Sequence, residues 1–291
     1  MKKYLLFSIF IVITGVAFAS VKTIGTPRVK NYPNTTYQAG TQSWSIDVGA
    51  NGMIYFANNE CVLEFDGVHW RSYPLPGQTV VRSVYASEDG RIYAGGFNEF
   101  GYFRKDAFGK MQFFPLHQSL PEKYRDFDDV WKIYPVNNAI IFQSYSQLMI
   151  LENDSFKVIE APGVFHFSFF VNEKLYLNDI EAGLLVFDGE KMNPLPGTER
   201  LQGHLILSLM ALGNNSLLLT TDDNGLFKYE NNELSNWETP ASGLLNESQV
   251  FCGLRISDSE FAFGTILNGL IICNREGELI QHINIDKGLQ N

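Results

Sequence analysis

The chain has 291 residues, of which 45% are hydrophobic and 19% charged, and this composition indicates a folded protein rather than a disordered one. Its length is typical of one large all-β barrel, sandwich or propeller. The formal net charge is −10, and it becomes −12 without Lys2 and Lys3, so the acidic surface argues against direct contact with nucleic acid or anionic lipid.

Residues 1–19 have the pattern of a signal peptide. Lys2 and Lys3 form a basic start, Leu5 to Phe18 an apolar run, and the last three residues a small-x-small cleavage site. An uncleaved membrane anchor is the alternative, but the run is short for a hydrocarbon core of roughly 30 Å. We therefore expect export, with Ser20 as the first residue of the mature chain.

Residues 20–41 form a polar N-terminal segment interrupted by Pro27 and Pro33. Within it, residues 28–33 resemble the later stretch 70–74, which reads as the last strand of a repeat. The segment therefore predicts an outer strand that has no repeat of its own.

Residues 42–291 contain six repeats of short β-strands. Second-strand residues align at spacings of 38, 48, 35, 42 and 44, and an aromatic or apolar third-strand residue follows 10 or 11 positions later. The aligned pairs are Tyr55 with Phe65, Tyr93 with Phe103, Ile141 with Leu151, Tyr176 with Phe187, Leu218 with Tyr229, and Ala262 with Cys273. This period predicts an all-β propeller of four-stranded blades; a large β-sandwich would not need it, and a β-helix would need shorter rungs.

The three cysteines, Cys61, Cys252 and Cys273, lie inside apolar strand patterns. We expect them to be small core residues. A bridge between Cys252 and Cys273 is the alternative, whereas a metal site is disfavoured because no pair has C-x-x-C spacing.

The first two repeats resemble a known family. The stretches 56–59, 63–70, 80–84 and 97–103 are similar to the regulator-propeller sensor regions of large Bacteroidetes regulators. These are hybrid two-component systems, and relatives that end in a Tyr-rich domain and a helix-turn-helix. The resemblance implies a periplasmic sensing propeller whose membrane-spanning and output parts lie outside these 291 residues, and it leaves open a homodimer of the full-length regulator.

The end of the chain bears on ring closure. Residues 288–291 follow a complete sixth outer strand, while residues 28–33 have no blade. A ring closed by pairing N-terminal and C-terminal strands removes exposed edges, so we expect partner strands beyond Asn291 and a seven-bladed or larger ring. A self-contained ring of six blades is the alternative.

Most candidate ligand residues are in loops between second and third strands or from one blade to the next, because such loops gather on one face around the channel of a propeller. Arg82 is added because it is a charge at an otherwise apolar position of an inner strand. Amides, carboxylates and aromatic rings there suit sugar hydroxyls and the apolar face of a sugar ring. The candidates are Asn58, Asn59, Arg82, Phe97, Asn98, Glu99, Tyr145, Asp179 and Asp222.

Several of these side chains also have a purely structural interpretation. Arg82 aligns with Trp44, Val130, Phe165, Leu207 and Phe251, and it could simply pair with Glu99 or Asp47. Trp44 and Trp131 are expected to be packing residues, and His166 a core residue. Asp222 and Asp223 could bind a cation, but they precede Asn224-Gly225 and fit a turn.

Enzyme signatures are weak. The chain has no G-x-S-x-G, H-E-x-x-H or phosphate-binding glycine loop, although Glu99 and Asp222 could be imagined as an acidic pair. We expect no catalytic residue, no cofactor and no metal. The sequence favours a non-catalytic sensor for an oligosaccharide or other small ligand; a propeller glycosidase or lyase, or a protein-interaction scaffold, are the alternatives.

Overall fold

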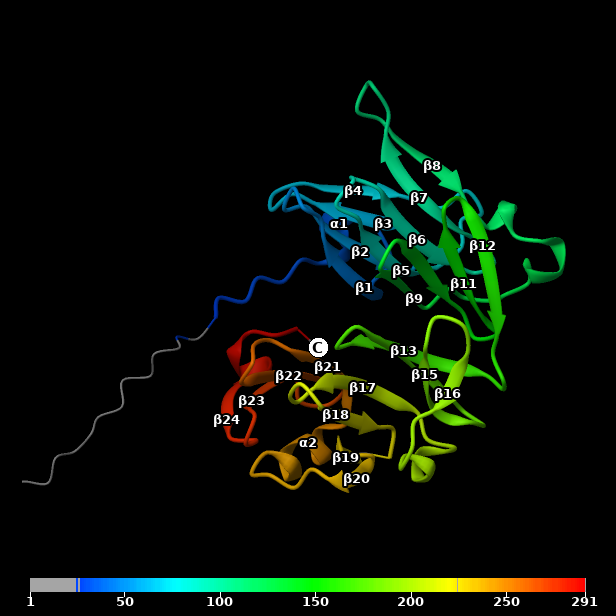
Figure 1. Cartoon of the computed structure of the whole chain (residues 1–291). Helices are drawn as coiled ribbons and strands as arrows, with labels where there is room; N and C mark the ends of the chain where they lie inside the picture. The colour runs from blue at the N-terminus through cyan, green and yellow to red at the C-terminus, as the bar shows by residue number, and fades with distance from the viewer. Residues whose placement is uncertain (1–24, 26, 224, 291) are drawn as a thin grey trace, which may run out of the picture.

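The computed structural model describes residues 25, 27–223 and 225–290, and they form a propeller of six four-stranded antiparallel blades. The first strand of each blade lies toward the middle of the ring and the fourth toward the outside (Figure 1). Blade 1 consists of β1 Ser43–Val48, β2 Ile54–Asn58, β3 Val62–Phe65 and β4 Trp70–Tyr73, and blade 2 of β5 Val81–Ala86, β6 Ile92–Gly96, β7 Phe100–Lys105 and β8 Met111–Pro115. Blade 3 consists of β9 Lys132–Val136, β10 Ala139–Gln143, β11 Gln147–Glu152 and β12 Ser155–Glu160, and blade 4 of β13 Phe165–Val171, β14 Lys174–Asp179, β15 Gly183–Phe187 and β16 Met192–Pro194. Blade 5 consists of β17 Ile206–Ala211, β18 Ser216–Thr221, β19 Leu226–Glu230 and β20 Glu233–Asn236, and blade 6 of β21 Val250–Arg255, β22 Glu260–Thr265, β23 Leu270–Asn274 and β24 Leu279–Ile283.

Short helices connect the blades. The helix α1 Asn34–Tyr37 precedes blade 1, and α2 Ser242–Ser248 lies between blades 5 and 6. Single 3₁₀ turns are η1 His117–Ser119, η2 Glu122–Tyr124, η3 Glu199–Leu201 and η4 Ile285–Lys287. No helix in the described part of the chain is long and apolar enough to cross a membrane.

Blades form because the second and third strands are largely apolar on both faces and each hairpin has a suitable turn. All six residues of β18 are buried, including Leu217, Leu218 and Leu219. Burying each leucine contributes about 2 kcal/mol, but only when neighbouring blades cover both faces. Gly67 adopts φ +94° in the turn between β3 and β4, where a residue with a side chain would be strained.

Five hydrophobic clusters join consecutive blades, one between each neighbouring pair from blades 1 and 2 to blades 5 and 6. A sixth, smaller cluster joins Tyr37 and Ala39 to the outer part of blade 1. Among the described residues, no cluster joins blade 6 to blade 1. The N-terminal segment passes between these two blades (Figure 1), where the Asn31 side-chain amide donates to the Gly288 carbonyl over 2.8 Å.

The predicted fold is therefore confirmed as an all-β propeller with six four-stranded blades. A larger ring stays a prediction, as do the proposed strand role of residues 28–33 and the domain boundaries. The predicted signal peptide, residues 1–19, lies outside the described residues.

The cysteine prediction is correct at two positions and wrong at the third. Cys61 and Cys273 are buried, and burial raises the pKa of each thiol to about 11. Cys252 is exposed, and all three thiols are free, so no bridge joins Cys252 to Cys273. Cys252 is exposed because the face of blade 6 that carries it has no covering blade.

Candidate functional site

The innermost strands share an irregularity at the same end of the propeller. The register of strand pairing shifts between Ser43 and Ser45, Val81 and Ser83, Phe165 and Ser168, Ile206 and Ser208, and Val250 and Cys252. Each shift leaves at least one unpaired residue, which is a β-bulge, and a bulge redirects its side chain. The bulged residues are Trp44, Arg82, His166 with Phe167, Leu207 and Phe251.

These bulges correct the predicted alignment of blades 3 and 4. Arg82 was aligned with Val130 and Phe165, but both of those side chains are completely buried. In blade 4 the bulge falls on His166 and Phe167. In blade 3, Trp131 directly precedes β9, and its backbone N–H donates to Gln143 at the end of β10. The side chains toward the channel are therefore Trp131 and Phe167.

Arg82 packs against two tryptophans that also contact each other. Its guanidinium carbon is 4.3 Å from the ring centre of Trp44 and 4.8 Å from that of Trp131. The two indoles meet edge to face, with ring centres 5.6 Å apart. Each such cation–π contact contributes about 0.5–1 kcal/mol when partly exposed. The two tryptophans therefore pack, as predicted, and they also hold the arginine.

Asp129 supplies the charge that balances Arg82. The Arg82 Nε lies 3.2 Å from Asp129 Oδ2, at ion-pair distance but without hydrogen-bond alignment. The predicted partners of Arg82 are wrong, because Glu99 accepts the Gly77 backbone N–H and Asp47 accepts that of Ala86. Asp129 was not singled out from the sequence, although it comes two residues before Trp131.

Further aromatic rings extend this group, which we call the tryptophan–arginine cluster: Trp44, Arg82, Asp129, Trp131, Tyr145 and Phe167. The rings of Tyr145 and Phe167 are 5.5 and 6.1 Å from that of Trp131. Burial, and then the nearby Asp129 carboxylate, raise the pKa of Tyr145. Tyr145 therefore offers a neutral hydroxyl to a ligand at neutral pH.

Lys132 brings a second basic side chain next to the cluster. Its ammonium lies 5.6 Å from the ring centre of Phe167, and burial lowers its pKa. In the described part of the chain, no carboxylate lies within ion-pair distance of Lys132. Sequence reasoning missed this residue because a lysine at the start of a strand is usually solvated.

Two buried side-chain nitrogens, one in the cluster and one beside it, have no hydrogen-bond partner in the described part of the chain. Trp131 Nε1 and His166 Nδ1 are buried, and neither makes a hydrogen bond among the described residues; Tyr145 is near Trp131 but outside hydrogen-bond geometry. Burial lowers the pKa of His166, so its imidazole is neutral at neutral pH. An unsatisfied buried polar group costs about 1–3 kcal/mol, and an acceptor on a ligand would remove that cost.

Four of the nine predicted ligand residues come together around the cluster. Arg82 and Tyr145 belong to it, and Asn59 Oδ1 accepts the Trp44 indole N–H over 2.7 Å. Phe97 is half exposed and forms a single backbone bridge with Asp129.

The other predicted residues have structural contacts. Asn58 is completely buried and donates to Gly40, while Asp179 is completely buried and accepts the backbone N–H of Gly163 and of two residues in its own turn. Asn98 holds the 126–128 loop through its side-chain amide, and Glu99 is 8% exposed. These four residues shape the loops of the channel face.

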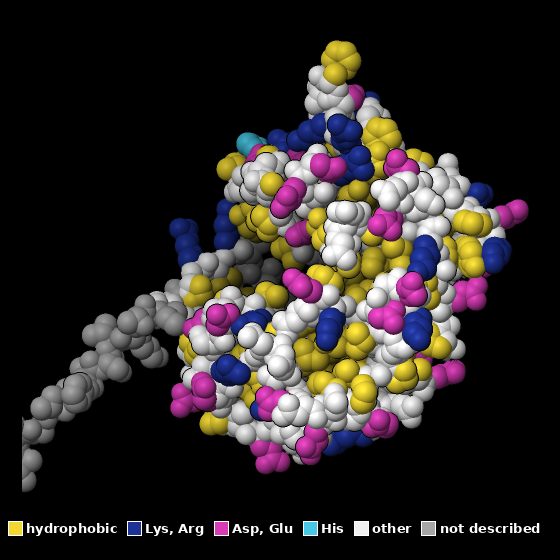
Figure 2. Space-filling model, viewed as in Figure 1, with side chains coloured by type: hydrophobic (Ala, Val, Ile, Leu, Met, Phe, Trp, Pro, Cys, Tyr) yellow, Lys and Arg dark blue, Asp and Glu magenta, His cyan; other side chains and the backbone are white. Residues whose placement is uncertain are grey.

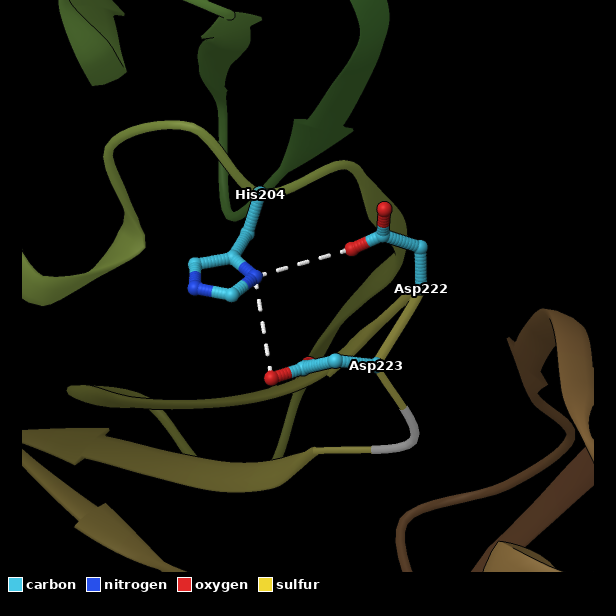
Figure 3. Close-up of side chains that lie close together, drawn as sticks. All are labelled: His204, Asp222 and Asp223. Carbon is cyan, nitrogen blue, oxygen red and sulfur yellow. Dashed lines mark ion pairs between the residues drawn. The ribbon is translucent and has the colours of Figure 1, made fainter.

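Asp222 lies in blade 5 in a separate group. Figure 3 shows the imidazole of His204 between the carboxylates of Asp222 and Asp223, at 3.7 and 3.6 Å. A hydrogen bond from the Thr221 hydroxyl, and then His204, lower the pKa of Asp223. One imidazole and two carboxylates are a set that binds divalent cations, but all three side chains are substantially exposed and explained by their mutual ion pairs.

Comparisons with known proteins give fold relatives only. No family model and no curated protein matches the chain. The extracellular domain of a hybrid two-component system from B. thetaiotaomicron is 16% identical with a TM-score of 0.63, and the match covers 85% of this chain and 33% of that one. Virginiamycin B lyase from Staphylococcus aureus is 12% identical with a TM-score of 0.59, covering 82% of this chain and 94% of the lyase. The WD40 β-propeller domain of Doa1 is 13% identical with a TM-score of 0.63, covering 83% of this chain and 82% of that one. The chain thus spans about a third of the length of that extracellular domain, and what it shares with all three proteins is the β-propeller fold.

Proposed function

We propose that this chain is the non-catalytic, ligand-binding propeller of a periplasmic sensor, and that it binds a glycan-derived ligand at the tryptophan–arginine cluster. The observation that carries the proposal is the Arg82 guanidinium packed against both Trp44 and Trp131, next to the rings of Tyr145 and Phe167. Aromatic faces cover the apolar side of a sugar ring, while guanidinium, indole and phenol donors take its oxygens.

The charges of the site favour an acidic sugar. Arg82 is balanced by Asp129, but Lys132 has no carboxylate partner in the described part of the chain. A ligand carboxylate would supply that partner and would restore the charged form that burial disfavours in Lys132. A uronic acid residue in an oligosaccharide combines this carboxylate with a stacking face.

The sensor role rests on the resemblance to regulator propellers and is supported by the shared fold. In such a protein the membrane span and the output module belong to other residues, and the acidic propeller makes no direct contact with nucleic acid. A homodimer of the full-length regulator would then connect ligand binding to output.

Titration calorimetry with neutral and uronate-containing oligosaccharides, combined with product analysis, tests the proposal. We expect saturable heat without products, stronger for the acidic sugars. Trp131→Ala should weaken binding roughly ten-fold or more, and Lys132→Met should remove the preference for acidic sugars. Phe108→Ala is the matched control, because Phe108 is 96% exposed in the turn between β7 and β8.

The other outcomes identify the alternatives. Released products would favour the alternative of a lyase or glycosidase. Virginiamycin B lyase has the same fold. No heat with any sugar would favour a protein-interaction scaffold. Equal loss of binding in Trp131→Ala and Phe108→Ala would contradict the proposal that the ligand binds at the tryptophan–arginine cluster.

A further inference from the structure

A polar groove lies between blades 4 and 5, at the strand ends opposite the tryptophan–arginine cluster. Its volume is about 540 Å³, which is within the range of pockets that hold a small ligand. β14 runs from Lys174 in this groove to Asp179 near the channel face, so roughly 17 Å of strand separate the two ends. Five asparagines line the groove: Asn172, Asn214, Asn215, Asn231 and Asn232.

The groove between blades 1 and 2 is built from the equivalent turns of its two blades, but its lining is different. Charged side chains line it: Glu88, Asp89, Arg104 and Lys105. The groove between blades 4 and 5 has one charged side chain, Lys174, and no carboxylate. This is not the general character of the surface, because acidic side chains outnumber basic ones in the chain and are spread over the face drawn in Figure 2. The propeller fold therefore does not require the amide lining.

Tyr176 offers the groove a hydroxyl that has no partner in the described part of the chain. Its counterpart in blade 1, Tyr55, lies opposite Glu64 on the neighbouring strand and donates to that carboxylate over 3.2 Å. Tyr176 lies opposite Val186, whose side chain cannot accept a hydrogen bond. Burial, and then the nearby Tyr229, raise the pKa of Tyr176, so its hydroxyl is neutral at neutral pH. The hydroxyl is therefore available to a ligand as both donor and acceptor.

Two of the five asparagines hold the walls of the groove. The Asn172 side-chain amide donates to the backbone carbonyls of Asn214 and the residue before it, both over 3.3 Å, and so ties a turn of blade 4 to a turn of blade 5. Asn232 Oδ1 accepts the Tyr229 hydroxyl over 3.1 Å. The other three side-chain amides make no hydrogen bond among the described residues: Asn214, Asn215 and Asn231.

Turn conformation explains only part of this set. Asn172, Asn231 and Asn232 have positive φ values, which asparagine tolerates better than most residues. Asn214 and Asn215 do not have positive φ. Their amides are thus required neither by the backbone nor by a hydrogen bond to the described protein.

We propose that this groove binds a neutral sugar, at a site separate from the tryptophan–arginine cluster. Each free amide carries donors and an acceptor, and a sugar hydroxyl can act as either, so every contact can be satisfied in one direction or the other. The Tyr176 hydroxyl adds a further donor and acceptor, and the Lys174 ammonium adds donors. Leu195 and Leu217 supply apolar surface for the C–H groups of the sugar ring.

NMR titration of the 291-residue chain, followed at side-chain amide and indole N–H signals, tests the proposal. The probes are maltose, cellobiose and lactose, with glycerol as a non-specific polyol. We expect saturable shifts of the Asn214 and Asn215 amides with at least one disaccharide, and an unchanged Trp131 indole signal. Combining Asn214→Ala with Asn215→Ala should weaken this binding about ten-fold or more, and Tyr176→Phe about three-fold. Glu88→Ala, in the corresponding turn of the groove between blades 1 and 2, is the matched control and should leave binding unchanged.

Four results would overturn the proposal. The first is the absence of amide shifts with all three disaccharides, and the second is the same shifts with glycerol at equal hydroxyl concentration. The third is unchanged affinity when Asn214 and Asn215 are both replaced while the remaining spectrum stays that of the folded chain. The fourth is tighter binding of trialanine than of any disaccharide, because the amides would then serve a peptide backbone.

Discussion

Replacing Arg82 with methionine removes the charge at the centre of the tryptophan–arginine cluster while keeping an apolar side chain of similar length. Two cation–π contacts, with Trp44 and Trp131, account for about 1–2 kcal/mol together. The ion pair with Asp129 adds about 1 kcal/mol, because the two side chains are only 18% and 16% exposed but keep some solvent screening. We therefore expect Arg82→Met to lower the free energy of unfolding by about 2–3 kcal/mol.

Urea unfolding followed by tryptophan fluorescence measures this loss directly. Two of the four tryptophans contact Arg82, so the emission of the native state should change as well. Asp129→Asn alone, and combined with Arg82→Met, completes a double-mutant cycle whose coupling should be about 1 kcal/mol. Arg255→Met is the control, since Arg255 pairs with the fully exposed Asp258 and its Nε donates to the Ser257 carbonyl, both within the same exposed turn. A loss under about 0.5 kcal/mol in Arg82→Met would refute the stacking argument.

Three further outcomes can be measured without a ligand. Burial lowers the pKa of Lys132, so the unfolded state binds more protons between the folded and the unfolded pKa. Stability should therefore rise with pH in the window below the ordinary lysine pKa of 10.5, and Lys132→Met should abolish this slope in urea titrations. Gly197→Ala should cost about 3 kcal/mol or more in thermal unfolding, since Gly197 has φ +76° and an added Cβ would lie 1.9 Å from a backbone carbonyl, whereas Gly67→Ala, in open space, should cost about 1 kcal/mol. Two backbone N–H groups lower the pKa of Asp188 to about 2, and a carboxyl NMR titration with a midpoint near the ordinary 3.8 would contradict that geometry.

The blade architecture could be predicted because its signal is local. A hairpin of two short strands has a nearly constant length, so Tyr55 with Phe65 and its five counterparts recur at a fixed step even where connecting loops differ. The structure pairs Ile54 with Phe65 and Ile92 with Phe103, one residue from the positions aligned by sequence. Local spacing thus specified the strands and their neighbours closely.

The positions toward the channel were harder to predict, because a bulge adds a residue without changing the apolar pattern. Arg82 could be recognised as unusual, but its counterparts in blades 3 and 4 were shifted by one or two residues. The shift matters here because it separates the buried Val130 and Phe165 from Trp131 and Phe167.

Burial of polar side chains was also invisible in the sequence. Asn58 and Asp179 follow strands and look like ligand residues, yet backbone groups of their own loops use their hydrogen-bonding capacity. The prediction for Cys252 was wrong for the opposite reason. Its sequence pattern is that of a buried strand residue, but no blade covers the face of blade 6 that carries it.

The repeated bulge has a consequence for how such a propeller can diverge. A bulged residue pairs with no residue on the neighbouring strand, so its side chain can change while the ladder keeps its register. Leu207 and Phe251 hold this position on blades 5 and 6, and Phe251 is 48% exposed. The bulged positions of five blades can therefore vary without disturbing strand pairing. Relatives that share this fold but recognise other molecules are expected to differ first at these bulges.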